Sequence, residues 1–153
     1  MAPLSTARAI AMSRFAIARD NCAPDMQIGM QEVGMEDHAC DSRYRSIINR
    51  LSDLIDISDR EPGCNLTKEL DNLLNTIMLH ICSENECMKL TGYPHVKNHY
   101  DNHSFLCSSI ANLCHLVLKG KEVVPKRLDL LRHLWLEHIQ THDKDFEEFL
   151  ISQ

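Results

Sequence analysis

The helical pattern is clearest in residues 95–119, HVKNHYDNHSFLCSSIANLCHLVLK. Apolar and imidazole side chains recur there in alternating steps of four and three residues: His99, His103, Leu106, Ile110, Leu113 and Val117. Because an α-helix has about 3.6 residues per turn, this spacing puts all of them on one face. Gly120 follows, and glycine readily adopts the left-handed conformation that ends many helices. We therefore predict one amphipathic helix here, with two histidines at core positions.

Three further stretches have the same periodicity. One begins at Asp41, the expected N-cap, and ends before residues 58–63, SDREPG; another covers about residues 65–90; the last begins at Pro125, a favourable first-turn residue. Their core positions include Tyr44, Ile48, Leu51, Ile55, Leu73, Ile77, His80, Glu84, Met88, Leu128, Leu131, Trp135, His138 and His142. No strand pattern is present and the connections are short. The sequence predicts an all-α fold, an up-down-up-down antiparallel four-helix bundle.

The composition limits the partners and the compartment. The net charge of −6 argues against nucleic acid, and no run approaches the roughly 18 apolar residues of a membrane helix. Seven cysteines, an odd number without a signal-peptide core, indicate reduced thiols and a cytoplasmic protein. We expect residues 35–153 to form the domain. Residues 1–34 are expected to be an N-terminal arm, with a transit-type leader or a later start at Met26 or Met30 as alternatives.

Polar side chains interrupt the apolar stripes midway along three of the predicted helices. His80 and Glu84 are four residues apart, as are His99 and His103, and His138 lies on the last core stripe. Residues four apart share one helix face, so each pair could chelate one ion. A single histidine on an apolar stripe is more often a hydrogen-bonded core residue, but five potential ligands on three helices favour a metal site. His38, His95, His115 and His133 fall off the stripes and are expected at the surface.

The order of these groups resembles the hemerythrin family. HICSE at 80–84, YP at 93–94 and HYDNH at 99–103 resemble the family's HxxxE, YP and HxxxH pattern. WLEHIQTHD at 135–143 resembles its WLxxHIxxxxD signature. The agreement extends over roughly residues 41–150, most of the chain.

The resemblance implies a non-haem di-iron site bridged by an oxo or hydroxo group. The implied ligands of one iron are His99, His103 and His138, that of the other is His80, and Glu84 and Asp143 bridge the two. Spacing alone would choose His142, four residues after His138, over Asp143, which is five residues on. Here the resemblance and the periodicity disagree.

The sequence departs from the family at the start of the first helix. Hemerythrins have a histidine in a DxxH segment, whereas residues 41–44 read DSRY and place Tyr44 there. His38 is a poor substitute because it lies six residues earlier, roughly 240° around the helix. Tyr44 is either a phenolate ligand or a core aromatic residue whose hydroxyl finds a partner.

The resemblance implies reversible binding of dioxygen, for transport, storage or sensing, and no catalytic residue. An oxygen-requiring enzyme would be a suitable recipient of the bound dioxygen. The expected walls of the oxygen pocket are Met88, Leu106, Ile110 and Trp135. Because Tyr44 alters the site, the alternative is a di-iron oxidoreductase acting on peroxide, nitric oxide or ferrous iron. A metal-free helical interaction module is a third possibility, and it would leave the buried polar groups unexplained.

Overall fold

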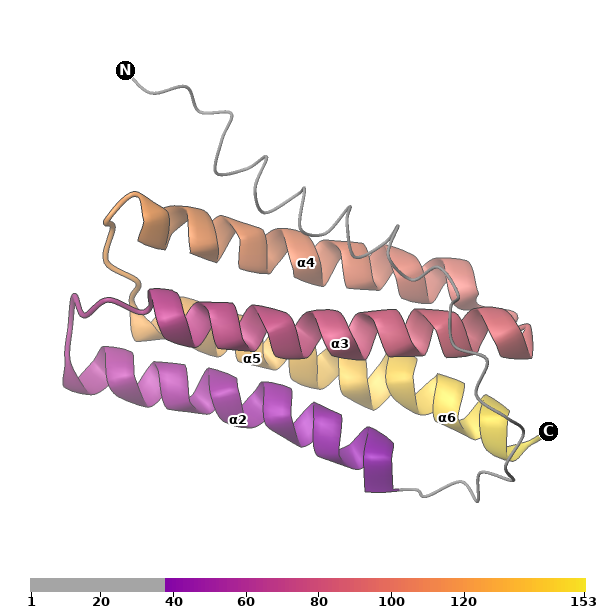
Figure 1. Cartoon of the computed structure of the whole chain (residues 1–153). Coiled ribbons are helices and arrows are strands. Elements are labelled where there is room, and N and C mark those ends of the chain that lie inside the picture. Colours follow the sequence, from indigo (N-terminus) through magenta and orange to yellow (C-terminus); the bar gives the residue numbers. More distant parts are fainter. Residues whose placement is uncertain (1–37) are drawn as a thin grey trace, which may run out of the picture.

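The computed structural model describes residues 38–153, with side chains from Tyr44 onward. This part of the chain is helical and contains no strand. Its elements are α2 (His38–Arg60), α3 (Thr67–Thr91), α4 (Val96–Leu118), α5 (Pro125–His138), η1 (Ile139–Asp143) and α6 (Lys144–Ile151). The last three form one continuous rod, so four long rods lie side by side (Figure 1). The predicted helical bundle is confirmed.

Local sequence signals account for most helix ends. The Asn65 side chain accepts a hydrogen bond from the Thr67 backbone N–H, 3.0 Å away, at the start of α3. Gly92 and Gly120 follow α3 and α4 with φ of 66° and 64°, the left-handed region that favours glycine. Pro125 opens α5 as predicted, after an extended Val124.

The beginning of α2 differs from the prediction. The helix starts at His38, so Asp41 lies inside it and the predicted N-cap at Asp41 is wrong. The N-terminal arm expected over residues 1–34 lies outside the described residues. Within residues 38–153, no helix is both long and apolar enough to cross a membrane.

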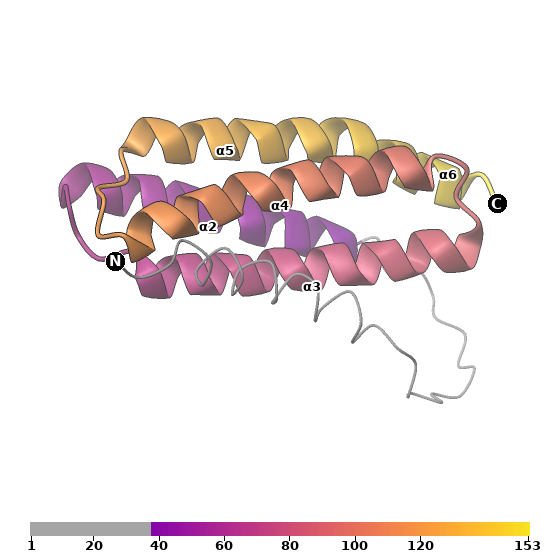
Figure 2. The same ribbon diagram turned by 90° about the horizontal axis from the view of Figure 1, so that it is seen from above.

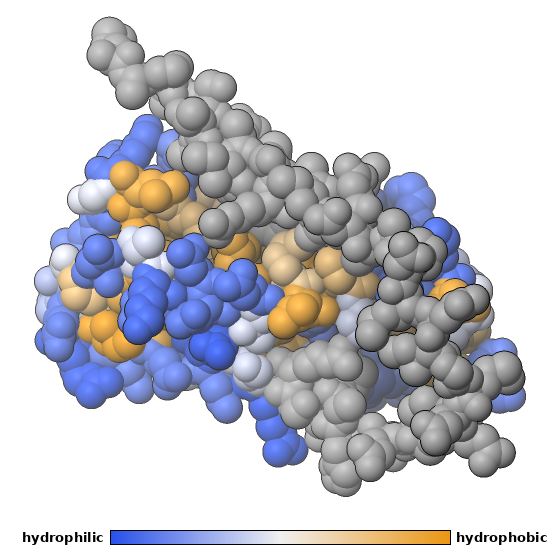
Figure 3. All heavy atoms as spheres, viewed as in Figure 1, coloured by the Kyte–Doolittle hydropathy of each residue, from blue (hydrophilic) through white to orange (hydrophobic). Residues whose placement is uncertain are grey.

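Each rod packs against two others. α2 packs against α3 and α5, and α4 packs against the same two helices. The connections between successive helices lie at alternating ends of the bundle (Figures 1 and 2). The Ser58 hydroxyl donates a hydrogen bond of 2.7 Å to the Val123 carbonyl and ties the end of α2 to the loop before α5. On the face in Figure 3, separate hydrophobic patches lie between hydrophilic residues.

The buried apolar side chains form two groups. The larger one contains Ile47, Leu73, Leu106 and Trp135 among others, and the smaller one contains Met88, Tyr93 and Phe146. Each fully buried Leu or Ile stabilises the fold by about 1.5–3 kcal/mol relative to exposure. Along α3, α4 and the last rod, the polar residues at 80–84, 99–103 and 138–143 fall between the two groups. The core is therefore divided by a layer of histidine and carboxylate side chains.

Candidate metal centre

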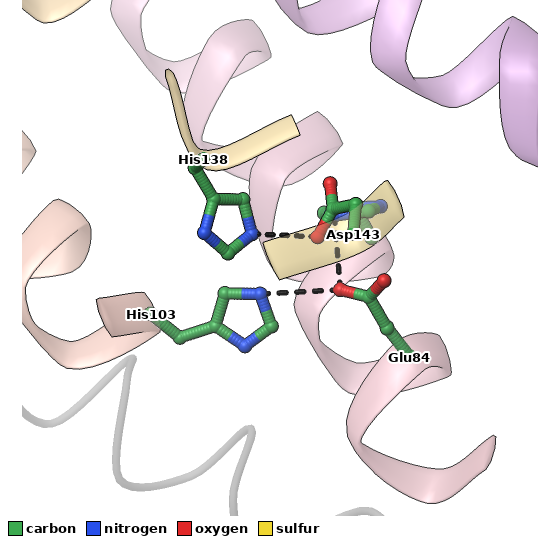
Figure 4. Close-up of side chains that lie close together, drawn as sticks. Glu84, His103, His138 and Asp143 are labelled. Atoms are coloured by element: carbon green, nitrogen blue, oxygen red, sulfur yellow. Dashed lines mark ion pairs between the residues drawn. The ribbon is translucent and has the colours of Figure 1, made fainter. Parts of the chain in front are cut away.

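Six titratable side chains meet in this layer. They come in pairs from α3 (His80 and Glu84), α4 (His99 and His103) and the last rod (His138 and Asp143). None is more than 6% exposed. Figure 4 shows ring nitrogens of His103 and His138 turned toward the carboxylates of Glu84 and Asp143. The side chains that the sequence predicted for one site are thus brought together.

Each carboxylate contacts three imidazoles. The Oε2 atom of Glu84 lies 3.3 Å from Nε2 of His80, 3.2 Å from Nε2 of His99 and 3.2 Å from Nε2 of His103. The Asp143 oxygens lie 2.8 Å from Nε2 of His138, 3.1 Å from Nε2 of His99 and 3.5 Å from Nε2 of His80. All four imidazoles therefore present the same ring nitrogen to the two carboxylates.

A π-helical turn delivers Asp143 to this layer. Residues Ile139–Asp143 form this turn between α5 and α6. Its hydrogen bonds run from residue i to i+5, so a residue five positions after His138 completes about one turn. Asp143 is fully buried, whereas His142 is only half-buried. The core position that α-helical spacing assigned to His142 belongs to Asp143, and that spacing prediction was wrong.

Two asparagines fix the orientation of two imidazoles. The Asn85 Oδ1 atom lies 3.0 Å from Nδ1 of His103, and the Asn102 Oδ1 atom lies 2.7 Å from Nδ1 of His138. With each Nδ1–H donating to an amide oxygen, the Nε2 lone pair is left pointing into the cluster. This is the tautomer that a metal-binding imidazole needs.

Helical spacing did not predict a role for either asparagine. Asn85 is next to Glu84 in the chain, and Asn102 is next to His103. Their roles depend on neighbouring helices: Asn85 on α3 contacts an imidazole of α4, and Asn102 on α4 contacts one of α5. No spacing within one helix reveals such a contact.

The donor set fits a metal ion. Five of the residues place one ligand atom each within 4.8 Å of one another: His80, Glu84, His103, His138 and Asp143. Apart from the contacts within the cluster given above, several of these buried atoms have no hydrogen-bond partner in the described part of the chain: Nε2 of His80, His103 and His138, both oxygens of Glu84, and Oδ2 of Asp143. Buried polar atoms that lack well-formed hydrogen bonds cost free energy, and a metal ion would offset that cost.

Charges within the cluster shift its pKa values strongly. Burial would raise the pKa of both carboxyl groups, but imidazole contacts outweigh it and hold the pKa of Glu84 and of Asp143 well below the usual range. Burial would lower the pKa of His80 and His99, but contacts with Asp143 and Glu84 raise both to about 9. For His103, burial prevails and lowers the pKa to about 4. Both carboxylates therefore stay ionised at neutral pH, as metal ligands must.

Aromatic residues border the cluster. Tyr44, 7% exposed, packs edge-on to His80 with ring centroids 5.0 Å apart. Trp135 is fully buried, with its ring 6.1 Å from His80 and 5.5 Å from His138. Tyr44 thus lies directly beside one of the imidazoles of the cluster.

The four apolar residues expected around an oxygen pocket do not lie together. Leu106, Ile110 and Trp135 belong to the larger apolar group, whereas Met88 belongs to the smaller one.

The remaining histidines lie outside the cluster. His95 and His133 are exposed, as predicted, whereas His115 is half-buried. The side chain of His38 lies outside the described residues. The His142 ring stacks on that of His138, with centroids 5.4 Å apart, at the edge of the site.

Comparisons with protein-family models, curated proteins and solved structures found no match for the chain.

Proposed function

We propose that this chain is a hemerythrin-like protein that binds dioxygen reversibly at a non-haem di-iron centre. The observation that carries the proposal is the convergence of four buried imidazole Nε2 atoms on two buried carboxylates. Imidazole with carboxylate is a ligand set that suits iron. The proposed ligands are those implied by the sequence resemblance: His80, Glu84, His99, His103, His138 and Asp143.

The order of the helices supports the same proposal. Connections at alternating ends of the bundle support an up-down-up-down antiparallel arrangement (Figures 1 and 2). Such bundles build metal sites in their cores from side chains on facing helices. We infer a hemerythrin-type bundle in which α2, α3, α4 and the α5–α6 rod take the four positions.

The chain's own residues would prepare the site for oxygen chemistry. When bound, a pair of iron ions with an oxo or hydroxo bridge supplies redox-active metal and a coordination position for dioxygen. Asn85 and Asn102 keep the proton of His103 and of His138 on Nδ1, which leaves Nε2 free to bind metal. Trp135 adjoins the cluster, and Leu106 lies one turn after His103, so apolar surface keeps water away.

A second candidate is a di-iron oxidoreductase acting on peroxide, nitric oxide or ferrous iron. The contact between Tyr44 and His80 favours it, because a phenol stands where a further imidazole would otherwise contribute a nitrogen donor. A phenolate ligand would favour ferric iron and weaken reversible oxygen binding. A tyrosine that does not bind iron would leave a further coordination position of the iron open to peroxide.

Iron analysis tests the metal site. Protein produced in iron-rich medium is expected to carry two iron ions per chain. The His103→Ala variant should lose iron, and His133→Ala, at an exposed histidine on α5, should keep it. Well-folded wild-type protein with almost no iron would contradict the proposal. If the visible absorbance of the iron-loaded protein bleaches irreversibly while the protein turns over peroxide, the oxidoreductase is favoured over the oxygen-binding protein.

A further inference from the structure

Sulfur-bearing side chains gather outside the histidine–carboxylate cluster, where α3 packs against α4. Two contacts fix how the two helices lie along each other. The Tyr100 hydroxyl donates a hydrogen bond of 3.1 Å to the Asn85 carbonyl oxygen. Earlier in α3, the His80 ring packs against the ring of His103, which is later in α4. The contacts thus move toward the end of α4 as they move toward the beginning of α3.

This arrangement brings Met78 and Cys107 to the same part of the interface. Met78 is seven residues before Asn85 in α3. Cys107 is seven residues after Tyr100 in α4. Because seven residues make about two helical turns, each side chain returns to the helix face that carries the hydrogen bond, about 10 Å farther along. Both side chains are half-buried and pack against the larger apolar group.

Cys82 adds a second thiol to this part of the interface. It is four residues after Met78, so the two share one face of α3. Burial, and then the neighbouring Cys82 thiol, raise the pKa of the Cys107 thiol to about 12. The two thiols are therefore near enough across the helix interface to act on each other electrostatically. A cation between them would offset the repulsion between two thiolates.

The donor atoms of this group are two thiols and a thioether. Such soft sulfur ligands select Cu⁺, whereas the histidine–carboxylate cluster offers nitrogen and oxygen. Zn²⁺ takes cysteine, histidine and carboxylate ligands, so the thioether of Met78 favours Cu⁺ over Zn²⁺. Because thiolate is the form that binds metal, a bound cation also displaces the protons that the thiols hold at neutral pH.

We propose that Met78, Cys82 and Cys107 form a binding site for Cu⁺ between α3 and α4. On binding, the ion forms bonds to the two cysteine sulfurs and to the methionine sulfur, and the thiol protons pass to solvent. Copper enters and stays as Cu⁺, so no electron is transferred. This site is distinct from the histidine–carboxylate cluster and does not depend on iron being bound there.

The test is a titration of the reduced full chain, without oxygen, with Cu⁺ supplied as its complex with the chromophoric chelator bicinchoninate. Wild-type protein should withdraw one Cu⁺ per chain tightly. Cys82→Ser and Cys107→Ser should each weaken this binding at least about tenfold, and Met78→Leu, which removes an uncharged donor, should weaken it less. Cys64→Ser is the matched control: Cys64 is half-buried and packs against the same apolar group, but lies before α3, and its loss should leave the affinity unchanged.

Two further measurements separate this site from the histidine–carboxylate cluster. X-ray absorption of copper-loaded wild-type protein should show sulfur atoms as the nearest neighbours of copper. His103→Ala, which removes an imidazole of the cluster, should bind Cu⁺ as the wild type does. Circular dichroism checks that each variant is folded. Nitrogen or oxygen as the nearest neighbours, loss of Cu⁺ from folded His103→Ala, or unchanged affinity in folded Cys107→Ser would overturn this inference and leave the di-iron proposal unaffected.

Discussion

His138 and Asp143 are five residues apart, yet Nε2 of His138 lies 2.8 Å from Oδ1 of Asp143, because a π-helical turn spans the interval between them. A regular α-helix would turn Asp143 about 140° away from His138 and bring His142 close to it instead. Single π-turns within α-helices occur frequently at functional sites. The irregular segment of the last rod is thus the one that supplies its carboxylate to the cluster.

The π-turn predicts opposite results for two adjacent substitutions. Asp143→Ala removes a fully buried carboxylate that contacts three imidazoles, so it should abolish binding of at least one of the two proposed metal ions. His142→Ala, one residue earlier and half-buried, should bind as much metal as the wild type. Metal content of the two purified variants, measured side by side, checks this. Equal loss of metal in the two variants would contradict the finding that Asp143, and not His142, belongs to the cluster.

The asparagine contacts predict a loss of affinity without a loss of ligands. Asn102→Leu removes the acceptor of the His138 Nδ1–H, and the loss of such a hydrogen bond to a metal-binding imidazole typically weakens metal binding about 10–100-fold. Asn112→Leu, at an exposed position of the same helix, is the matched control and should bind metal normally. Competition with a chelator measures both affinities. An Asn102→Leu variant that binds like the control would assign the contact a purely structural role.

The pKa shifts predict how the stability of metal-depleted protein depends on pH. The pKa values of His80 and His99 are raised from 6.5 to about 9, so the stability they contribute is complete below pH 6.5 and is lost as the pH rises through 9. The pKa of His103 is lowered to about 4, so the folded protein binds fewer protons there and loses stability below pH 6.5. Stability should therefore be greatest near pH 6.5.

Urea unfolding between pH 5 and 9 measures this dependence. Each histidine with a raised pKa should lower the free energy of unfolding by up to about 1.4 kcal/mol per pH unit above pH 6.5. Metal displaces these protons, so the decline should be absent in metal-loaded protein. A metal-depleted protein whose stability does not change between pH 6.5 and 9 would contradict the raised pKa values.

Tyr44 has two candidate roles that a visible spectrum separates. If its hydroxyl binds ferric iron as a phenolate, the oxidised protein should have a charge-transfer band that is missing in Tyr44→Phe. If Tyr44 only packs against His80, the two spectra should agree. The second result would remove phenolate ligation as an argument for the oxidoreductase and leave the open coordination position as its support.

Helical periodicity predicted the helical bundle, and residues with strong local preferences marked several of the helix ends. Pro125 begins α5 and Gly120 follows α4, as expected from their backbone conformations. The start of α2 was misplaced at Asp41, since a good capping residue also fits within a helix that begins earlier.

The site was predictable where its residues repeat at α-helical spacing. His80 with Glu84, and His99 with His103, are of this kind. Asp143 was not predictable from spacing, because periodicity assumes an unbroken α-helix and the chain forms a π-turn there. The contacts of Asn85 and Asn102 cross between helices, so they depend on packing that no single-helix pattern encodes.

The most direct test of the oxygen-binding proposal is the visible spectrum of the iron-loaded, anaerobically reduced protein before and after exposure to dioxygen. We expect a new visible band on oxygenation that disappears when the oxygen is removed under vacuum. An iron-loaded protein that gives no band, or one that bleaches irreversibly, would contradict reversible oxygen binding at this site.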